Sequence, residues 1–183
     1  MTAAKIKITT PLSGSVIKGL SRGDSVSLSG VLYTARDAAH ARLVEMLARH
    51  ETMPFDFEGA AVYYAGPSPA RPGAATGSIG PTTSGRMDSY SPTLIAAGLK
   101  VMIGKGLRNS SVKEAIVKHG GVYLAATGGA AALIARSVKA SEVIAFPELG
   151  AEAIRRLEVE DFPAIVAIDS EGNDIYERGG RTK

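Results

Sequence analysis

The hydrophobic residues change their period after residue 34, and this change limits the possible folds more than any other feature. Residues 25–34 (SVSLSGVLYT) alternate polar and apolar side chains, as a half-buried strand does. Apolar residues then fall at 43, 44 and 47, which is one face of a helix over residues 37–50, with Asp37 as the expected N-cap. The chain therefore passes from a strand directly into a helix.

The same succession recurs further along the chain. Residues 100–103 predict a strand before a helix over 111–120, and residues 122–126 predict another strand before an Ala-rich helix. Segments near both ends have an antiparallel pattern. We therefore expect the α/β class with a mixed sheet. The remaining predicted elements are strands over 5–9, 60–65 and 143–146, helices over 12–20, 91–98 and 152–157, and a hairpin over 163–176.

Length and composition predict one soluble domain over residues 1–183, with a polar tail from residue 177. The net charge of +3 is small and no block of Lys and Arg is present, so we expect no nucleic-acid partner. The first residues lack the apolar core of a signal peptide. The longest uncharged stretch, 120–135, is shorter than the roughly 20 residues that a bilayer requires. A cytoplasmic protein without membrane contact is expected.

Two glycine-bounded turns carry polar side chains suited to an anion. The turn at 80–85 contains three consecutive hydroxyls and is followed by Arg86, and the turn at 104–106 holds Lys105 between glycines. Successive N–H groups in such turns bind anions, while arginine and lysine add positive charge. Arg36 follows a predicted strand and precedes a helix, where α/β proteins often bind ligands. A small anionic substrate is the functional interpretation, and ordinary connecting turns are the alternative.

Three segments, GPTTSGRMD (80–88), IGKG (103–106) and TARDAAH (34–40), together resemble the β subunit of two-subunit class I fumarases and L-tartrate dehydratases. These are iron–sulfur hydro-lyases, and in single-chain relatives the same region forms the C-terminal domain. The resemblance covers nearly the whole chain, with the motifs in family order and similar spacing. It implies a single swivelling β/β/α domain.

The resemblance also implies a [4Fe-4S] cluster, whose open iron polarises substrate oxygens as a Lewis acid. Such clusters are normally held by cysteine, and this chain contains none. Its histidines have no metal-ligand spacing. We therefore expect a cluster bound by a partner α subunit, no metal ligand in this chain, and activity only in the hetero-oligomer.

The family pattern assigns roles to individual residues. It makes Arg36, Arg86 and Lys105 binders of a dicarboxylate or hydroxy-acid substrate, and Thr82 the acid/base at the carbon that exchanges a proton. A threonine hydroxyl is a poor base at its normal pKa, so Thr82 would need activation by nearby cations or by the substrate. The residues expected to support this site are Asp37, His40, Thr83, Ser84 and Asp88.

Each supporting residue also has a structural interpretation. Arg36 with Asp37, and Arg86 with Asp88, can form ion pairs of little energetic value. His40 shares a helix face with apolar residues, which favours a buried, hydrogen-bonded histidine. The other residues with two interpretations are Thr83 and Ser84, which can satisfy loop backbone groups, and the turn Thr127, Gly128 and Gly129, which can hold an anion or permit close packing.

Three functions follow from these patterns. The first is the β subunit of a fumarate hydratase, which forms L-malate. The second is the β subunit of an L-tartrate dehydratase, and the third is a non-catalytic carboxylate-binding module. The irregular segment 66–80 is expected to form a long loop over the active region.

Overall fold

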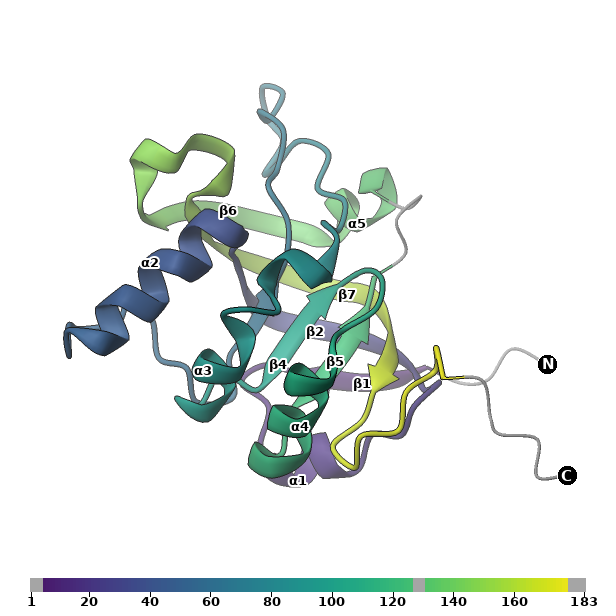
Figure 1. The fold of residues 1–183 in the computed structure, drawn as a ribbon. Coiled ribbons are helices and arrows are strands. Elements are labelled where there is room, and N and C mark those ends of the chain that lie inside the picture. Colours follow the sequence, from purple (N-terminus) through teal and green to yellow (C-terminus); the bar gives the residue numbers. More distant parts are fainter. Residues whose placement is uncertain (1–4, 127–130, 178–183) are drawn as a thin grey trace, which may run out of the picture.

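The computed structural model describes residues 5–126 and 131–177, which form one mixed sheet of seven strands with short helices (Figure 1). The strands are β1 (Ile6–Thr9), β2 (Ser25–Thr34), β3 (Ala61–Tyr63), β4 (Val101–Gly104), β5 (Val122–Ala125), β6 (Val138–Ala145) and β7 (Ile154–Ile168). The α-helices are α1 (Gly14–Lys18), α2 (Asp37–Ala48), α3 (Ser91–Ala96), α4 (Ser110–His119) and α5 (Ala131–Ser137). Two 3₁₀ helices are η1 (Ser84–Met87) and η3 (Pro147–Glu152). The predicted turn at 127–129 and the tail from residue 178 lie outside the described residues.

The strand order is β1-β2-β3-β4-β5-β7-β6, and β2 pairs with β7 as well. Strands β1 to β5 are parallel, whereas β7 runs antiparallel to β2, β5 and β6. Since β7 joins β5 to β2, the strands β2, β3, β4, β5 and β7 close on one another. The predicted α/β class with a mixed sheet is confirmed.

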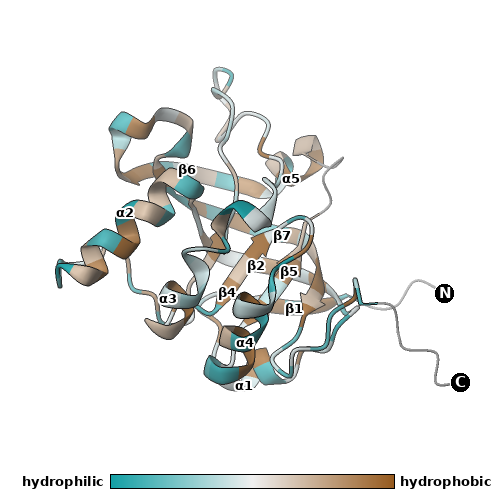
Figure 2. Ribbon diagram, in the orientation of Figure 1, coloured by the Kyte–Doolittle hydropathy of each residue, from teal (hydrophilic) through white to brown (hydrophobic). Residues whose placement is uncertain are grey.

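Two hydrophobic cores lie on opposite faces of the parallel strands. Alternate residues of β3 and β4, such as Tyr63 and Ile103, belong to the core shared with β7. Their neighbours Val62 and Met102 belong to the core beneath α2, α3 and α4, which lie together on one side of the strands (Figure 1). Strands β4 and β5 are accordingly apolar along most of their length, while the helices carry both polar and apolar residues (Figure 2). This two-sided burial gives the β/β/α layering that the resemblance implies.

Two predictions of local structure are wrong. Arg36, and not Asp37, is the N-cap of α2, because its backbone is still extended (φ −110°, ψ −168°) after β2. Asp37 is the first helical residue, and no side chain caps this helix. The predicted helix over 152–157 is instead the end of η3 and the start of β7. Leu157 pairs there with Leu32 on one edge and Ser141 on the other, and this pairing prevails over local helix preference.

No helix among the described residues combines the length and the apolar character needed to cross a membrane.

A bulge in β2 depends on Thr10. The register with β7 shifts between Leu28 and Gly30, and Gly30 has φ +106°, which favours glycine. At this point the Thr10 hydroxyl accepts a hydrogen bond from the Val31 N–H (2.6 Å) and donates one to the Val31 carbonyl (2.8 Å). One buried side chain therefore satisfies both backbone groups beside the bulge.

Thr10→Val should lower the free energy of unfolding by about 1–3 kcal/mol, because the substitution leaves buried backbone groups of Val31 unpaired. Urea unfolding followed by circular dichroism measures the change. The matched control is Thr9→Val at the last residue of β1, where the side chain is exposed. Equal stability of the two variants would contradict the role of Thr10.

Candidate active site

The carboxyl ends of the parallel strands place the predicted site residues at one edge of the sheet. Arg36 follows β2 by two residues, Lys105 follows β4 directly, and the segment leading to Thr82 leaves from the end of β3. Because these strands are parallel, their carboxyl ends meet at the same edge, a common ligand-binding position in α/β folds. Local sequence and topology thus bring three distant segments together.

Backbone hydrogen bonds join the two glycine-bounded turns. The Ser84 N–H donates to the Lys105 carbonyl (2.9 Å), and Thr83 forms a parallel bridge with Lys105. The Thr82 N–H donates to the Tyr64 carbonyl (2.6 Å) at the end of β3. Thr82 is half-buried, whereas the side chains of Arg86 and Lys105 are exposed. The turn that carries Thr82 and Arg86 is therefore held directly alongside the turn that carries Lys105.

The buried side chain of Ser84 also helps to hold the two turns together. It is fully buried, and its hydroxyl lies 2.9 Å from the hydroxyl of Tyr123, which in turn donates to the Gly106 carbonyl (2.9 Å). A Cβ on Gly104 would lie only 2.0 Å from the Ser84 oxygen. A glycine is required at 104 for this close contact. Ser84 bonds a tyrosine hydroxyl through its side chain, in addition to the backbone bond to Lys105.

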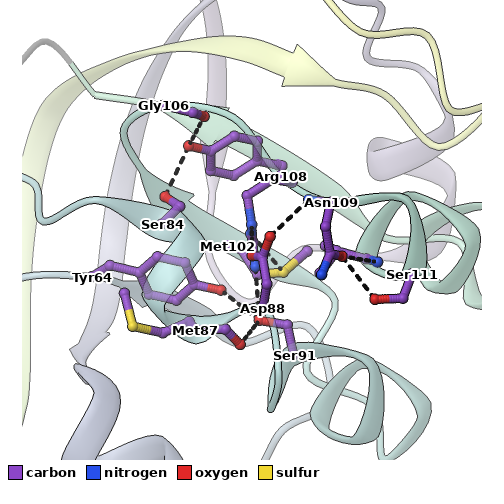
Figure 3. A network of polar contacts seen from close by, with 12 residues as sticks. Tyr64, Ser84, Met87, Asp88, Ser91, Met102, Gly106, Arg108, Asn109 and Ser111 are labelled. Carbon is purple, nitrogen blue, oxygen red and sulfur yellow. Dashed lines mark hydrogen bonds and ion pairs between the residues drawn. The ribbon is translucent and has the colours of Figure 1, made fainter.

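A buried ion pair connects the two turns a second time (Figure 3). Arg108 Nε donates to Asp88 Oδ1 (2.6 Å), and the Asn109 N–H donates to Asp88 Oδ2 (2.7 Å). A further guanidinium nitrogen of Arg108 donates to Ser91 Oγ (2.7 Å). Asp88 is only 7% exposed, and its partner is Arg108, so the alternative of an Arg86–Asp88 ion pair is wrong. Arg86 is left to face solvent.

Aromatic rings enclose the Arg108 guanidinium. Its central carbon lies 5.3 Å from the centre of the Tyr64 ring and 5.0 Å from that of Tyr123. These rings give the buried cation favourable electrostatic contact where water is excluded. The buried Asp88–Arg108 ion pair therefore links the segment 84–88 to the segment 105–109, and its two opposite charges balance each other.

Arg36 belongs to a second charged cluster, in which Glu152 is the residue that the sequence did not reveal. Arg36 Nε lies 3.1 Å from Glu152 Oε1 and 3.8 Å from Asp37 Oδ1. Partial burial and the negative charge of Asp37 raise the pKa of Glu152, while the positive charges of Arg36 and Arg86 oppose that rise. Arg36 and Arg86 therefore act electrostatically on the same carboxylate. Arg36 Nε and Asp37 Oδ1 are shielded from solvent without a hydrogen-bond partner in the described chain.

His40 holds the backbone of Arg36. The residue is 1% exposed, and both its backbone N–H (2.9 Å) and its ring Nδ1 (2.8 Å) lie against the Arg36 carbonyl. A carbonyl only accepts, so Nδ1 carries the ring proton. Burial lowers the pKa of His40 to about 4, and His40 is therefore neutral at pH 7. Its contacts support Arg36 from the buried side.

Two other residues of the site carried no local signal. Arg108 and Tyr123 lie in ordinary sequence contexts, and their partners are 20 and 39 residues away. The one available hint was that Arg108 closely follows the turn at 104–106.

The donor atoms in this chain do not suit an iron–sulfur cluster. Cysteine is absent from the sequence, and within residues 5–126 and 131–177 no three His, Asp or Glu side chains gather as metal ligands would. The site instead presents guanidinium, ammonium and hydroxyl groups, which bind anions. The fold and site therefore define an α/β domain with cationic and hydroxyl-bearing side chains at the carboxyl ends of its parallel strands.

Comparison with known proteins gives the family. Residues 1–179 match the family model described as "Fumarase C-terminus". The chain is 43% identical over 182 residues to fumarate hydratase 2 of Leishmania major, covering 97% of this chain and 32% of that protein. It is 42% identical over 181 residues to the aerobic class I fumarate hydratase of Salmonella typhimurium, covering 96% and 31%. The chain thus spans about a third of these relatives.

A shorter relative matches over most of its own length. This protein of Methanocaldococcus jannaschii carries the provisional name L(+)-tartrate dehydratase subunit beta. It is 44% identical over 167 residues, which cover 88% of this chain and 86% of the relative. The chain belongs to the fumarase C-terminus family, and the resemblance inferred from its three motifs is confirmed.

Lowering the pH from 7.5 to 5 should cost about 2 kcal/mol of stability through His40 alone. The pKa of His40 is about 4 in the folded chain, against 6.5 for an ordinary histidine. The unfolded chain therefore takes up a proton that the folded chain does not, and stability falls as the pH drops from 6.5 towards 4. Urea unfolding at a series of pH values measures this slope.

The variant His40→Gln should lose that part of the pH dependence. His50→Asn is the control, since residue 50 is exposed and has φ 55°, which asparagine tolerates. An unchanged slope in His40→Gln would show that another group causes the pH dependence.

Proposed function

We propose that this chain is the substrate-binding half of a hydro-lyase that converts fumarate reversibly to L-malate. The observation that carries this proposal is the hydrogen bond from Ser84 to the Lys105 carbonyl, together with the bridge between Thr83 and Lys105. These contacts align a hydroxyl-bearing turn with a cationic turn. The family membership supplies the reaction class.

The cations of the site suit a dicarboxylate. Within the described chain, neither Arg86 nor Lys105 has a carboxylate within 4.0 Å, so both are available to a ligand. An arginine can accept a carboxylate with two parallel N–H bonds, while a lysine adds a point charge. Donors fixed before the substrate arrives also stabilise negative charge that develops during the reaction.

Arg36 takes part differently in the proposed site. Its guanidinium already has a partner in Glu152, so a substrate carboxylate would share or replace that contact. Arg36 Nε lies 3.1 Å from Glu152 Oε1 without the geometry of a hydrogen bond, so a substrate carboxylate that met this N–H in line would complete its hydrogen bonding. Burial and the negative charge of Asp37 raise the pKa of Glu152, so Glu152 is more easily protonated when a substrate carboxylate lies nearby.

Thr82 is the proposed acid/base of this chain. Its backbone is held by the Tyr64 carbonyl, and Arg86 and Lys105 lie on the adjoining segments. Nearby cations favour the deprotonated form of a hydroxyl and so make Thr82 a better base. In this mechanism the cations orient the dianion, and Thr82 moves the proton at the neighbouring carbon.

The rest of the active site would come from a partner. The curated fumarases are about three times as long as the matching segment, and this chain lacks cysteine. We assign the [4Fe-4S] cluster to an α subunit, with no ligand from this chain.

L-tartrate dehydration is the second candidate, and the relative from Methanocaldococcus jannaschii favours it. That protein is named as a separate β subunit and matches this chain over 86% of its length. Both substrates are dianions, so the same cations would serve either one.

The decisive assay uses the chain alone and then purified together with its cluster-bearing partner, under anaerobic conditions. We expect fumarate hydration in the complex only, with bound iron, and L-tartrate measured beside it identifies the substrate. A well-formed, iron-loaded complex that converts neither compound would overturn the catalytic proposal. Binding without turnover would then favour the carboxylate-binding module.

Arg86→Ala should lower kcat/KM of the assembled enzyme by about 10²-fold, because an oriented cation that stabilises the transition state is removed. The assay is steady-state kinetics on the complex. Arg49→Ala is the matched control, as Arg49 is 70% exposed at the far end of α2. Near-normal activity of Arg86→Ala would remove Arg86 from the site.

A further inference from the structure

A hollow of about 290 Å³ lies next to the candidate active site, between the long loop, η3 and the face of β6 and β7. Its lining consists of loop residues 67–70, 75 and 76, Ser141, Gly150, Ala151 and Arg155. The loop is held in place by a hydrogen bond from the Ser68 N–H to the Ser78 carbonyl (2.9 Å). The walls of the hollow therefore come from three separate parts of the chain.

Three polar atoms around this hollow are shielded from solvent and lack a hydrogen-bond partner in the described chain. They are Thr76 Oγ1 on the loop, Ser141 Oγ on β6 and Arg155 Nε on β7. Buried polar atoms are nearly always hydrogen-bonded in native proteins. All three atoms belong to residues that line the hollow, so rotation of these side chains toward it would let a bound ligand supply the missing partners.

The chemistry of the lining selects an anion. Arg155 is the one ionisable residue of the lining, and no carboxylate of the described chain lies within 4.0 Å of its guanidinium. The Nε edge of an arginine presents two parallel N–H bonds, which match a planar carboxylate. Hydroxyls can donate to the same group or bond a polar substituent next to it.

We infer that this hollow is a second binding site for a small carboxylate, held by Arg155, Thr76 and Ser141. The inference does not rest on the proposed function, because none of these residues belongs to the candidate active site. A volume of about 290 Å³ suits a metabolite-sized anion rather than a larger cofactor.

The hollow adjoins the cluster around Arg36. Ala151 lines the hollow, and the next residue, Glu152, pairs with Arg36. Gly66, at the start of the loop, packs closely there, since a Cβ on it would lie 2.8 Å from the Ala151 carbonyl and 3.3 Å from Arg36 Cδ. A bound carboxylate would thus contact both segments that surround the Arg36–Glu152 pair.

The test is an NMR titration of the ¹⁵N-labelled 183-residue chain with acetate. We expect saturable shifts of the backbone amides of Ser68, Thr76, Ser141 and Ala151. Acetamide has the same shape without the charge and should leave these amides unchanged. Arg155→Met should weaken acetate binding at these amides by about tenfold or more, because charge-assisted hydrogen bonds are lost.

The variants distinguish acetate binding in the hollow from acetate binding at the candidate active site. Arg155 pairs with β2 and β6 through its backbone, so methionine should leave the strand intact. Arg86→Ala should retain the acetate response at the hollow, and Ser141→Ala should weaken it severalfold. The inference is overturned if acetamide shifts the same amides equally, if Arg155→Met binds acetate as the natural chain does, or if acetate shifts only residues 82–86 and 105.

Discussion

The buried ion pair between Arg108 and Asp88 is the contact on which the geometry of the candidate site depends. A buried cation is costly unless its charge and hydrogen bonds are all satisfied. Here the carboxylate, the Ser91 hydroxyl and two tyrosine rings surround the guanidinium. Such a pair adds little net stability over an apolar core, but removing either partner would leave a buried charge unpaired. Its value lies in fixing two turns against each other.

The buried Asp88–Arg108 pair also supports the segments that carry the exposed cations Arg86 and Lys105. Arg86 lies two residues before Asp88, and Lys105 lies three residues before Arg108. Both side chains face solvent, yet their backbones are held by the Ser84–Lys105 hydrogen bond and the contact of Ser84 with Tyr123. A site that is fixed before ligand binding loses less free energy in ordering its groups. Buried support beneath exposed charged side chains is therefore consistent with a ligand-binding edge.

Closure of the sheet through β7 explains why η3 reaches this edge. Strand β7 pairs with β2 along its length, and η3 immediately precedes it. This pairing places Glu152 beside Arg36 and places Arg155 in the lining of the neighbouring hollow. The η3 segment and the strand β7 that follows it thus supply side chains to the Arg36 cluster and to the hollow, whose other residues come mostly from earlier in the sequence.

Local sequence patterns were sufficient for much of this protein. The change of period at residue 34 predicted the boundary between β2 and α2, and the glycine-bounded turns predicted where Lys105 and Thr82 would lie. The α/β class followed from such patterns, because turns and amphipathic periods depend on neighbouring residues, whereas the family followed from the resemblance of three motifs to a known family. Only the tertiary structure decided that Asp88 pairs with Arg108, that Glu152 joins Arg36 and that residues 154–157 form a strand. Those outcomes depend on contacts between residues far apart in the chain, and pairing on both edges of β7 outweighs any local preference of its residues.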